Sequence, residues 1–304
     1  MATDFDLIVI GEGVTGLTAA GAAARAGRRV ATYEATLFGG LVINVNELHG
    51  DVPDGAASGT DYAAGLMTQN SELGVDSRNE EVTGLEAAGG VITVLTAGGR
   101  ATAQRVIVAS GARLKPLGVP GEAEFEHRGV SHCADCDGPL YAEAEVVVVG
   151  GGDSAVQEAL VLAQFARTVH LVHRGGSLTA RPEFIAQVQA NGRILVHWHT
   201  VVERIEGGEG VEKVVVRDTK AGTVRELAAT GFFAYVGLAP NSGFLPAAVK
   251  RDERGRVVTD AALATTLPGV FAAGAVRAGY DGRLVTAVAE GEAAARAACA
   301  GLAG

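Results

Sequence analysis

At 304 residues the chain is longer than one typical domain, and its 48% hydrophobic content can fill the cores of two. The formal charge of −10 offers no basic stripe to neutralise phosphates, which argues against a general nucleic-acid surface. No run of about 18 apolar residues and no basic leader is present, so we expect neither a membrane span nor a secretory signal, and we expect the cytoplasm as the compartment.

The first predicted elements form a strand–turn–helix–strand unit. An apolar run over residues 5–10 predicts a buried strand, the Ala-rich stretch 15–26 predicts a helix that stops at Gly27, and residues 29–34 predict a second, parallel strand. The first strand and the helix are joined by a GxGxxG turn, Gly11-Glu12-Gly13-Val14-Thr15-Gly16.

Each glycine of this turn has a physical role in binding a dinucleotide. Gly11 permits the tight turn, Gly13 lets the backbone approach a pyrophosphate, and Gly16 lets the helix pack on the strand. The helix N-terminus then offers free N–H groups to the anion. Glu34 ends the second strand and is placed to accept hydrogen bonds from an adenosine ribose.

Residues 81–108 alternate as hairpin strands, and a cysteine pair follows them. Cys133 and Cys136 lie three positions apart, directly before Asp137. This spacing allows a disulfide that opens and closes, and the neighbouring carboxyl group could manage the proton. The pair makes thiol–disulfide chemistry the candidate function.

A second strand–turn–helix–strand unit follows the cysteines. Residues 145–149 predict a strand, 153–167 a helix and 169–173 another strand. The turn between the first two has the form GxGxxA, with the sequence Gly150-Gly151-Gly152-Asp153-Ser154-Ala155. A basic pair at the end of the second strand, His173-Arg174, is typical of a site that reads a 2′-phosphate; an ordinary solvated strand end is the alternative.

The remaining elements predict how the domains are arranged. The stretch 194–235 repeats the hairpin pattern, 269–274 supplies a closing strand for the first unit, and an Ala-rich helix starts at Leu284. We therefore expect an α/β chain of two Rossmann-like, three-layer ββα dinucleotide-binding domains, the second inserted in the first. The first comprises residues 1–115 plus 240–304, and the second comprises residues 116–239 and carries the cysteine pair.

Two dinucleotide turns and a redox CxxC together indicate an electron relay. A nicotinamide would deliver hydride, a flavin would accept it, and a dithiol would carry the electrons onward. The flavin is chemically needed because a thiol does not take hydride efficiently from a nicotinamide.

From Phe5 to beyond Gly291 the chain resembles the low-molecular-weight thioredoxin reductases, which are FAD-dependent pyridine nucleotide-disulfide oxidoreductases. The most specific match is Cys133-Ala134-Asp135-Cys136-Asp137-Gly138 to the family's C-A-T-C-D-G. Residues 106–112, 237–241 and 268–274 match other family segments. The resemblance implies an FAD-bound homodimer that takes electrons from NADPH or NADH and reduces a thioredoxin-like protein or a small disulfide.

The resemblance also implies roles for individual residues. Cys136 would be the thiol next to the flavin, Cys133 would attack the external disulfide, and Asp137 would be the acid/base. The residues implied to bind FAD are Gly11, Gly13, Val14, Thr15, Gly16, Glu34, Gly39, Gly40, Leu41, Asn46, Val82, Ala109, Ser110, Gly111, Gly274, Ala275, Arg283, Leu284 and Val285. Those implied to bind the nicotinamide nucleotide are Gly150, Gly152, Asp153, Ser154, Ala155, His173, Arg174 and Arg181.

The chain departs from the family pattern around both cofactors. Ala275 follows Gly274 where the family usually has an Asp, and Leu284 and Leu41 stand where it usually has Gln. Residues 173–179 keep one arginine of the pattern H-R-R-x-x-x-R. NADH or reduced ferredoxin are therefore alternative donors, and a dithiol oxidase or a regulatory relative with weakened flavin binding are alternative functions. We expect no metal site.

Overall fold

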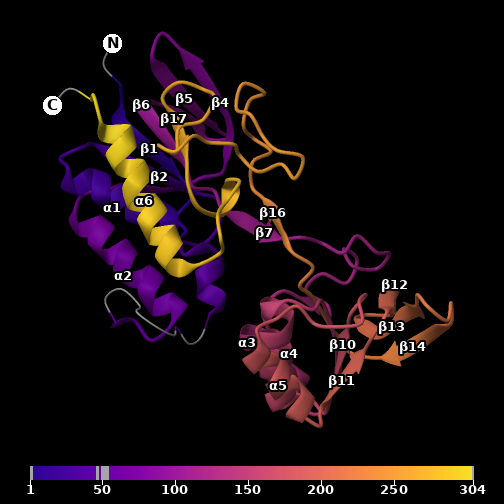
Figure 1. The fold of residues 1–304 in the computed structure, drawn as a ribbon. Helices are drawn as coiled ribbons and strands as arrows, with labels where there is room; N and C mark the ends of the chain where they lie inside the picture. Colours follow the sequence, from indigo (N-terminus) through magenta and orange to yellow (C-terminus); the bar gives the residue numbers. More distant parts are fainter. Residues whose placement is uncertain (1–2, 46–47, 49–54, 303–304) are drawn as a thin grey trace. The chain divides into compact units, whose positions relative to one another are not determined.

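The computed structural model describes residues 3–45, 48 and 55–302, and the α/β class expected from the sequence is confirmed. The chain divides into two compact units (Figure 1). Unit 1 comprises Met1–Arg113 and Ala239–Gly304, and unit 2 comprises Leu114–Leu238. The domain boundaries expected from the sequence lie after residues 115 and 239, and they stay a prediction.

Unit 1 is built on one sheet with the strand order β3-β2-β1-β6-β5-β4, in which β17 also pairs with β6. The strands are β1 (Phe5–Ile10), β2 (Val30–Glu34), β3 (Asp76–Asn79), β4 (Val82–Ala88), β5 (Val91–Thr96), β6 (Gly99–Val108) and β17 (Val270–Ala272). The pairs of β1 with β2 and β6, of β2 with β3 and of β6 with β17 are parallel, whereas β4, β5 and β6 are antiparallel hairpin strands. The hairpins predicted over 81–108 and the closing strand predicted over 269–274 are both confirmed.

Three helices lie on one side of this sheet (Figure 1). They are α1 (Val14–Arg25), α2 (Gly59–Glu72) and α6 (Leu284–Cys299), and two short 3-10 turns, η1 (Gly40–Asn44) and η4 (Gly274–Val276), lie near them in the sequence. Helices α1 and α6 pack closely because their contact is lined by small residues: a Cβ built on Gly291 would lie 2.6 Å from the carbonyl oxygen of Thr15. The sequence predicted α1 and α6, but not α2.

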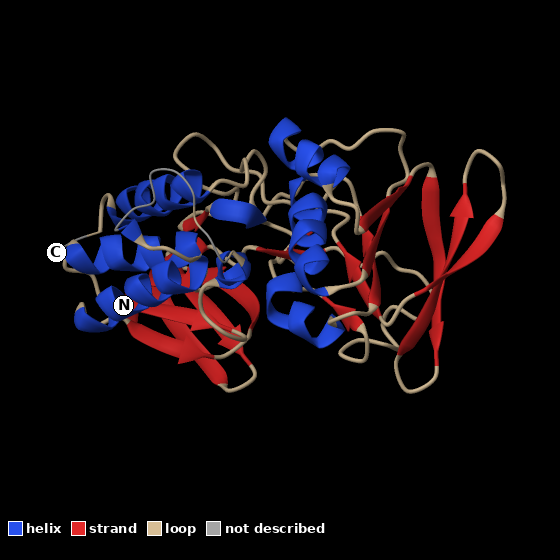
Figure 2. Cartoon of the chain, turned by 90° about the horizontal axis from the view of Figure 1, so that it is seen from below, coloured by secondary structure: helices blue, strands red, loops and turns tan. Residues whose placement is uncertain are grey.

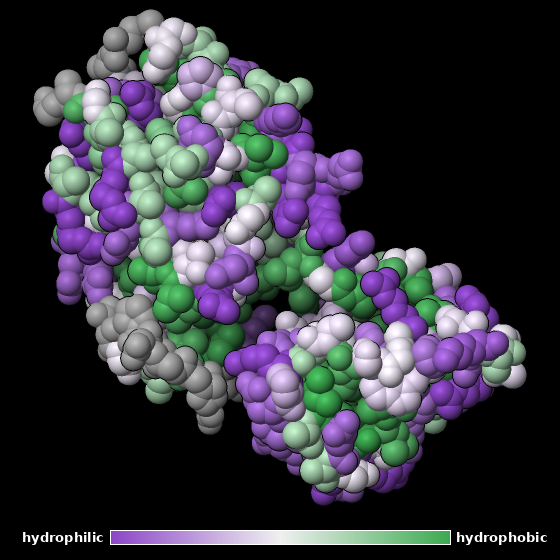
Figure 3. Space-filling view, viewed as in Figure 1, coloured by the Kyte–Doolittle hydropathy of each residue, from purple (hydrophilic) through white to green (hydrophobic). Residues whose placement is uncertain are grey.

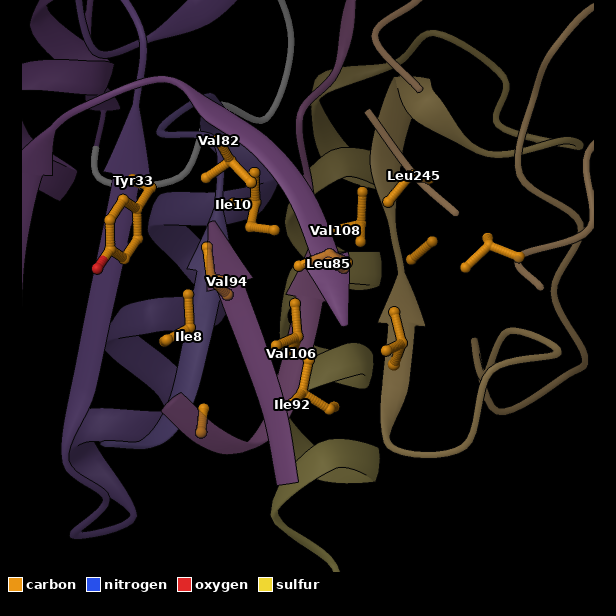
Figure 4. Close-up of a cluster of buried hydrophobic side chains, with 14 of the residues drawn as sticks. Ile8, Ile10, Tyr33, Val82, Leu85, Ile92, Val94, Val106, Val108 and Leu245 are labelled. Carbon is orange, nitrogen blue, oxygen red and sulfur yellow. The ribbon is translucent and has the colours of Figure 1, made fainter. Parts of the chain in front are cut away.

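Both faces of the unit 1 sheet are covered. Leu7 and Val9 belong to a cluster shared with α1 and α6, and Ile8 and Ile10 belong to a cluster on the opposite face (Figure 4). All four side chains are at most 4% exposed, so the alternation of strand side chains fills two cores rather than one. The near-continuous apolar run of β1 follows from this double burial.

Unit 2 has a parallel sheet with the strand order β11-β10-β9-β15-β8 and a separate antiparallel sheet, β12-β13-β14. Its strands are β8 (Val130–Ser131), β9 (Glu145–Val149), β10 (Thr168–Val172), β11 (Ile194–His197), β12 (Thr200–Gly207), β13 (Val211–Asp218), β14 (Val224–Ala228) and β15 (Gly231–Ala234). The helices α3 (Ala134–Asp137), α4 (Asp153–Phe165) and α5 (Pro182–Ala190), with the 3-10 turn η3 (Gly138–Tyr141), pack on the parallel sheet, and the antiparallel strands cover its other face (Figure 2). The hairpin prediction for 194–235 holds for β12–β14 only, because β11 and β15 pair in parallel with the main sheet.

The chain passes between the units through a short two-stranded sheet formed by β7 (Ala112–Leu114) and β16 (Leu238–Pro240). Just inside unit 2, the amide of Lys115 donates to the carbonyl oxygen of Gly237 over 2.9 Å, so the two ends of this unit are adjacent. Within the described residues, no helix is both long and apolar enough to cross a membrane.

Candidate active site

The first glycine-rich turn accepts no side chain at two of its positions. Gly11 has a φ of 104°, and a Cβ built on it would lie 2.4 Å from the carbonyl oxygen of Ala109. A Cβ on Gly16 would lie 1.9 Å from the carbonyl oxygen of Gly11. Glycine is therefore required here for the close approach of β1, α1 and the segment after β6.

The start of α1 is open to an anion. Gly13 is its N-cap and no side chain caps the helix, so the first-turn amides of Thr15 and Gly16 find no partner within the helix. A Cβ on Gly13 would meet nothing closer than the carbonyl oxygen of Gly39, 3.8 Å away. This uncapped end with an unobstructed glycine fits the pyrophosphate of a dinucleotide.

Glu34 keeps one acceptor site for a ligand. Its Oε1 accepts hydrogen bonds from the amides of Ala35 (2.9 Å) and Thr36 (3.2 Å), and its Oε2 accepts one from the amide of Glu12 (3.0 Å). A carboxylate oxygen can accept two hydrogen bonds, so Oε2 can also accept a ribose hydroxyl. The local amides fix the orientation of the carboxylate.

Sequence reasoning gave no role to Glu12, which lies between two glycines of the turn and is only 3% exposed. Its Oε1 accepts hydrogen bonds from the hydroxyl groups of Thr32 and, at 2.6 Å, Ser77. Its carbonyl oxygen accepts the amide of Gly39 at 2.6 Å. Glu12 therefore ties the turn to β2, β3 and the start of η1. The only sequence signal was an acid inside a glycine-rich turn.

A second buried acid, Glu290 on α6, also escaped prediction. Its Oε2 accepts the amide of Gly274 (2.7 Å) and the Nε of Arg277 (2.8 Å), and its Oε1 accepts the Nη2 of Arg277. Gly274 itself has a φ of 75°, and a Cβ there would lie 2.5 Å from the hydroxyl oxygen of Thr15. Glu290 thus holds the η4 turn on α6, with Gly274 close to Thr15 of the first glycine-rich turn. The only indication of Glu290 in the sequence was an acidic residue within the apolar stripe of an Ala-rich helix.

The remaining residues predicted for unit 1 lie in backbone contacts, in the core, or at turns and helix starts. Two make backbone contacts. A Cβ built on Gly40 would lie 3.3 Å from the Cα of Gly13, and the hydroxyl group of Ser110 donates to the carbonyl oxygen of Asn241 over 2.7 Å. The side chain of Val82 lies in the core cluster and is 7% exposed. The others lie at turns or helix starts, and they are Gly111, Ala275, Arg283, Leu284, Val285 and Leu41. Asn46 lies outside the described residues.

Exposed apolar side chains accompany these positions. Leu41 is 38% exposed and Val285 is 53% exposed. Figure 3 shows apolar surface over the start of α6 in unit 1. Such a surface suits a flat, largely apolar ring better than a charged group.

Cys133 and Cys136 are joined by a disulfide at the start of α3. Cys136 is exposed and Cys133 is partly buried. The amide of Cys136 donates to the Sγ of Cys133 over 3.1 Å, a contact that would also stabilise a thiolate on Cys133.

Asp137 is held beside the disulfide by Ser131. The hydroxyl group of Ser131, a residue only 6% exposed, donates to Oδ2 of Asp137 over 2.6 Å. The same hydroxyl oxygen accepts the amide of Cys133 at 3.3 Å. Ser131 therefore connects the predicted acid/base to the backbone of the predicted nucleophile, a role that the sequence did not reveal.

A second carboxyl group contacts the CxxC segment from α4. Oε2 of Glu158 accepts the amide of Ala134 at 2.9 Å. Burial raises the pKa of Glu158 above its usual range, and burial together with the adjacent Glu158 raises the pKa of Tyr235. The sequence gave no indication of this contact, because α4 and α3 lie 16 or more residues apart.

The second glycine-rich turn has the same construction as the first. Gly150 has a φ of 149°, and a Cβ there would lie 2.5 Å from both the Cβ of Ala155 and the carbonyl oxygen of Tyr235. Gly152 is the N-cap of α4, which has no side-chain cap, and Ser154 in its first turn is exposed. These predicted residues therefore gather at the carboxyl end of β9, where dinucleotides bind in such sheets.

Residues 5–293 match the family model described as Pyridine nucleotide-disulphide oxidoreductase. The chain belongs to this family. Over 300 residues it is 40% identical to the thioredoxin reductase of Treponema pallidum (strain Nichols), a match that covers 98% of this chain and 97% of the relative. It is 38% identical to the thioredoxin reductase of Mycolicibacterium smegmatis, covering 90% and 88%.

Solved structures of the same kind align over almost the whole chain. The crystal structure of Lactococcus lactis thioredoxin reductase (FR conformation) aligns with a TM-score of 0.92 at 35% identity and covers 97% of this chain and 98% of its own. That of T. acidophilum thioredoxin reductase aligns with a TM-score of 0.90 at 30% identity and covers 98% of each chain. The family, the fold and the Cys133–Cys136 disulfide together show that this protein is a flavin-dependent thiol–disulfide oxidoreductase.

Proposed function

We propose that this oxidoreductase reduces the disulfide of a thioredoxin-like protein with electrons from a nicotinamide nucleotide. The observation that carries the proposal is the Cys133–Cys136 disulfide, whose second cysteine is exposed and whose neighbouring acid, Asp137, is oriented by Ser131. FAD would be held by the uncapped N-terminus of α1 and by Glu34, whose Oε2 can accept one more hydrogen bond.

When bound, FAD supplies a carrier for one electron pair between the nicotinamide and the disulfide. Two electrons and one proton break the bond between the sulfurs and leave one thiol and one thiolate, and Asp137 gives or takes that proton. The Cys133 thiolate then attacks one sulfur of the target disulfide, forms a mixed disulfide and releases the other target sulfur. Cys136 attacks the Sγ of Cys133, which restores the internal disulfide and releases the target as a dithiol.

Single cysteine variants test this order of events. In the Cys136→Ser variant the mixed disulfide cannot be resolved, so a thioredoxin treated with the pre-reduced variant should accumulate as a covalent adduct through Cys133. The Cys133→Ser variant should form no such adduct. Non-reducing electrophoresis and mass spectrometry of the linked peptides measure both.

Cys299 provides the matched control, because it is the third cysteine of the chain and lies partly buried on α6 of unit 1. The Cys299→Ser variant should reduce thioredoxin at the unaltered rate. An adduct formed through Cys136 in the Cys133→Ser variant would reverse the assigned roles. Absence of thioredoxin reduction by the unaltered, FAD-loaded protein with both NADH and NADPH would refute the proposed function.

We also propose the homodimer that the resemblance implied. Sedimentation of the purified protein should give a mass near twice the chain mass of 30.8 kDa.

A further inference from the structure

The electron donor is decided by the segment that follows β10, residues 173–181, and this inference rests on the proposed use of a nicotinamide nucleotide. In a dinucleotide-binding sheet the end of the second strand reads the adenosine ribose: an acceptor there suits a free diol, and free arginines suit a 2′-phosphate. The cationic side chains of this segment, besides His173, are Arg174 and Arg181. Their partners determine what can be bound.

Arg181 is engaged by acids. Oδ1 of Asp153 accepts its backbone amide at 2.7 Å, and Oδ2 of Asp153 accepts its Nε at 3.0 Å. Its Nη1 lies 3.7 Å from Oε1 of Glu183, and its guanidinium stacks 4.3 Å from the ring centroid of Phe184. These contacts occupy Nε and neutralise the charge of Arg181, so a phosphate would meet a guanidinium that is already paired with carboxylates. Arg174 is exposed and makes no hydrogen bond or ion pair with the part of the chain that the structure describes.

In its neutral form, His173 presents an acceptor at the strand end. Its Nδ1 lies 3.1 Å from the carbonyl oxygen of Gly150. A carbonyl oxygen can only accept, so in the neutral ring the proton is on Nδ1 and Nε2 carries a lone pair. A lone pair suits a ribose hydroxyl and repels a phosphate oxygen.

The loop after His173 packs its glycines against two imidazole rings. A Cβ built on Gly175 would lie 2.8 Å from Nε2 of His173, and one built on Gly176 would lie 2.8 Å from Cε1 of His199. The amide of His199 also donates to the carbonyl oxygen of Gly175 over 3.0 Å, which holds the loop in place. An arginine at position 175 or 176 would therefore displace an imidazole ring.

Trp198 provides a surface for a purine at the same edge of the sheet. It directly follows β11, is 39% exposed, and its ring meets that of His173 edge-on, with the centroids 6.1 Å apart. Its carbonyl oxygen accepts the hydroxyl group of Thr200 at 2.7 Å, which fixes the turn that carries it. An exposed, fixed indole can stack on an adenine.

We propose that unit 2 prefers NADH to NADPH, with adenine stacked on Trp198, a ribose hydroxyl donating to Nε2 of His173, the charge of Arg181 neutralised by Asp153, and Arg174 left as the remaining cation that can contact a 2′-phosphate.

The test uses the fact that Trp198 is the only tryptophan of the chain. The FAD-loaded protein is titrated with NAD⁺ and, separately, with NADP⁺, and tryptophan fluorescence is recorded; the oxidised nucleotides exclude electron transfer. NAD⁺ should quench the fluorescence with a dissociation constant about tenfold or more below that of NADP⁺, since Asp153 neutralises Arg181 and weakens its charge-assisted hydrogen bonding to the phosphate. The kcat/KM values for NADH and NADPH should show the same preference.

The Asp153→Asn variant removes the charge that engages Arg181. It should reduce the NAD⁺ preference, because the guanidinium of Arg181 is then no longer neutralised by Asp153 and attracts the 2′-phosphate more strongly. The Glu183→Gln variant removes the longer contact and is the matched control, whose preference should stay unchanged.

Equal or tighter binding of NADP⁺ by the unaltered protein, an unchanged preference in Asp153→Asn, or no quenching by either nucleotide would each overturn the inference. Preferential quenching by NAD⁺ in a protein that fails to reduce thioredoxin would support it while refuting the proposed function.

Discussion

At the scale of single residues, two buried acids organise the predicted flavin site. Glu12 and Glu290 are 3% and 8% exposed, and each carboxylate accepts hydrogen bonds from groups in other parts of unit 1. A buried carboxylate is tolerated only when it is paired in this way. The glycine motif around Glu12 was predictable from spacing, whereas the partners of both acids come from distant segments and could not be read from the sequence.

The pair of Glu290 and Arg277 gives the first prediction. Its side chains are 9% and 18% exposed, so the Glu290→Ala variant would leave a buried guanidinium and the amide of Gly274 without their acceptor. We expect a loss of about 3 kcal/mol in the free energy of unfolding, measured by urea denaturation, and weaker binding of FAD by the apoprotein.

The control is Glu292→Ala, which removes an exposed acid paired with Arg296 on the same helix. It should cost no more than about 0.5 kcal/mol. Equal losses in the two variants would contradict the role assigned to Glu290.

Ser131 gives a second prediction at this scale. The Ser131→Ala variant removes the hydroxyl group that orients Asp137 and accepts the amide of Cys133. We expect disulfide reduction to slow on the order of tenfold, part of what a positioned acid/base contributes, with a changed pH profile of kcat.

The Ser131→Thr variant keeps the hydroxyl and should restore most of the rate and the pH profile. Ser177→Ala, an exposed change in the same unit, should leave both unaltered. A pH profile that is the same in Ser131→Ala as in the unaltered protein would show that Ser131 only supports the fold.

At the scale of elements, the strands and helices next to the two glycine-rich turns, most hairpin strands and the last helix were predictable, whereas α2, β3 and the pairing of β11 and β15 were not. Helices α1, α4 and α6 and strand β9 follow from glycine punctuation and apolar periodicity. Helix α2 buries few residues and β3 is mostly exposed, so neither has a periodic apolar pattern. Strands β11 and β15 looked like hairpin strands because pairing partners are a tertiary property.

A chain of polar side chains crosses neighbouring strands of unit 2. Nδ1 of His170 lies 2.9 Å from Nε2 of His197, whose Nδ1 accepts from Arg225 over 2.8 Å. Nε2 of His170 lies 3.2 Å from Oε2 of Glu145, which Arg167 also contacts through Oε1. Burial, with the charge of Arg225, lowers the pKa of His197 to about 4.

This lowered pKa predicts a pH-dependent stability. Folding favours the neutral imidazole, so the stabilisation is complete above pH 6.5 and is lost as the pH falls towards 4, where the folded protein must also take up the proton. Allowing for the partial exposure of His197, we expect a loss of about 1–2 kcal/mol over this range. Urea denaturation at a series of pH values measures it.

The His197→Gln variant should flatten this part of the pH dependence. The exposed His127 serves as the control, and His127→Gln should preserve it. An unchanged slope in His197→Gln would assign the acid sensitivity to other groups.

At the scale of the whole molecule, the α/β class and the family could be recognised from the sequence because two glycine-rich turns and the CxxC segment lie in a fixed order. The residue assignments of the two cofactor sites stay predictions. The ion pairs could not be predicted from the sequence. For example, Asp153 pairs with Arg181, which lies 28 positions away. Spacing alone does not show which cations are already neutralised.

Because each unit has its own hydrophobic cores, ligands should stabilise the units separately. In calorimetry, FAD at 100 times its dissociation constant should add about 2.7 kcal/mol to the stability of unit 1 only. NAD⁺ should shift the transition of unit 2 only. A single transition that both ligands raise together would show that the units unfold cooperatively.

The hydrogen bond between Lys115 and Gly237 has a consequence for how such a chain can be taken apart or assembled. A segment whose entry and exit are neighbours can be removed and its flanks rejoined by a tight loop, without stretching the remainder. Residues 115–237 therefore have the geometry of a cassette: a gene fragment for them could be transplanted into a surface turn of an unrelated host, or deleted here to leave a minimal flavoprotein.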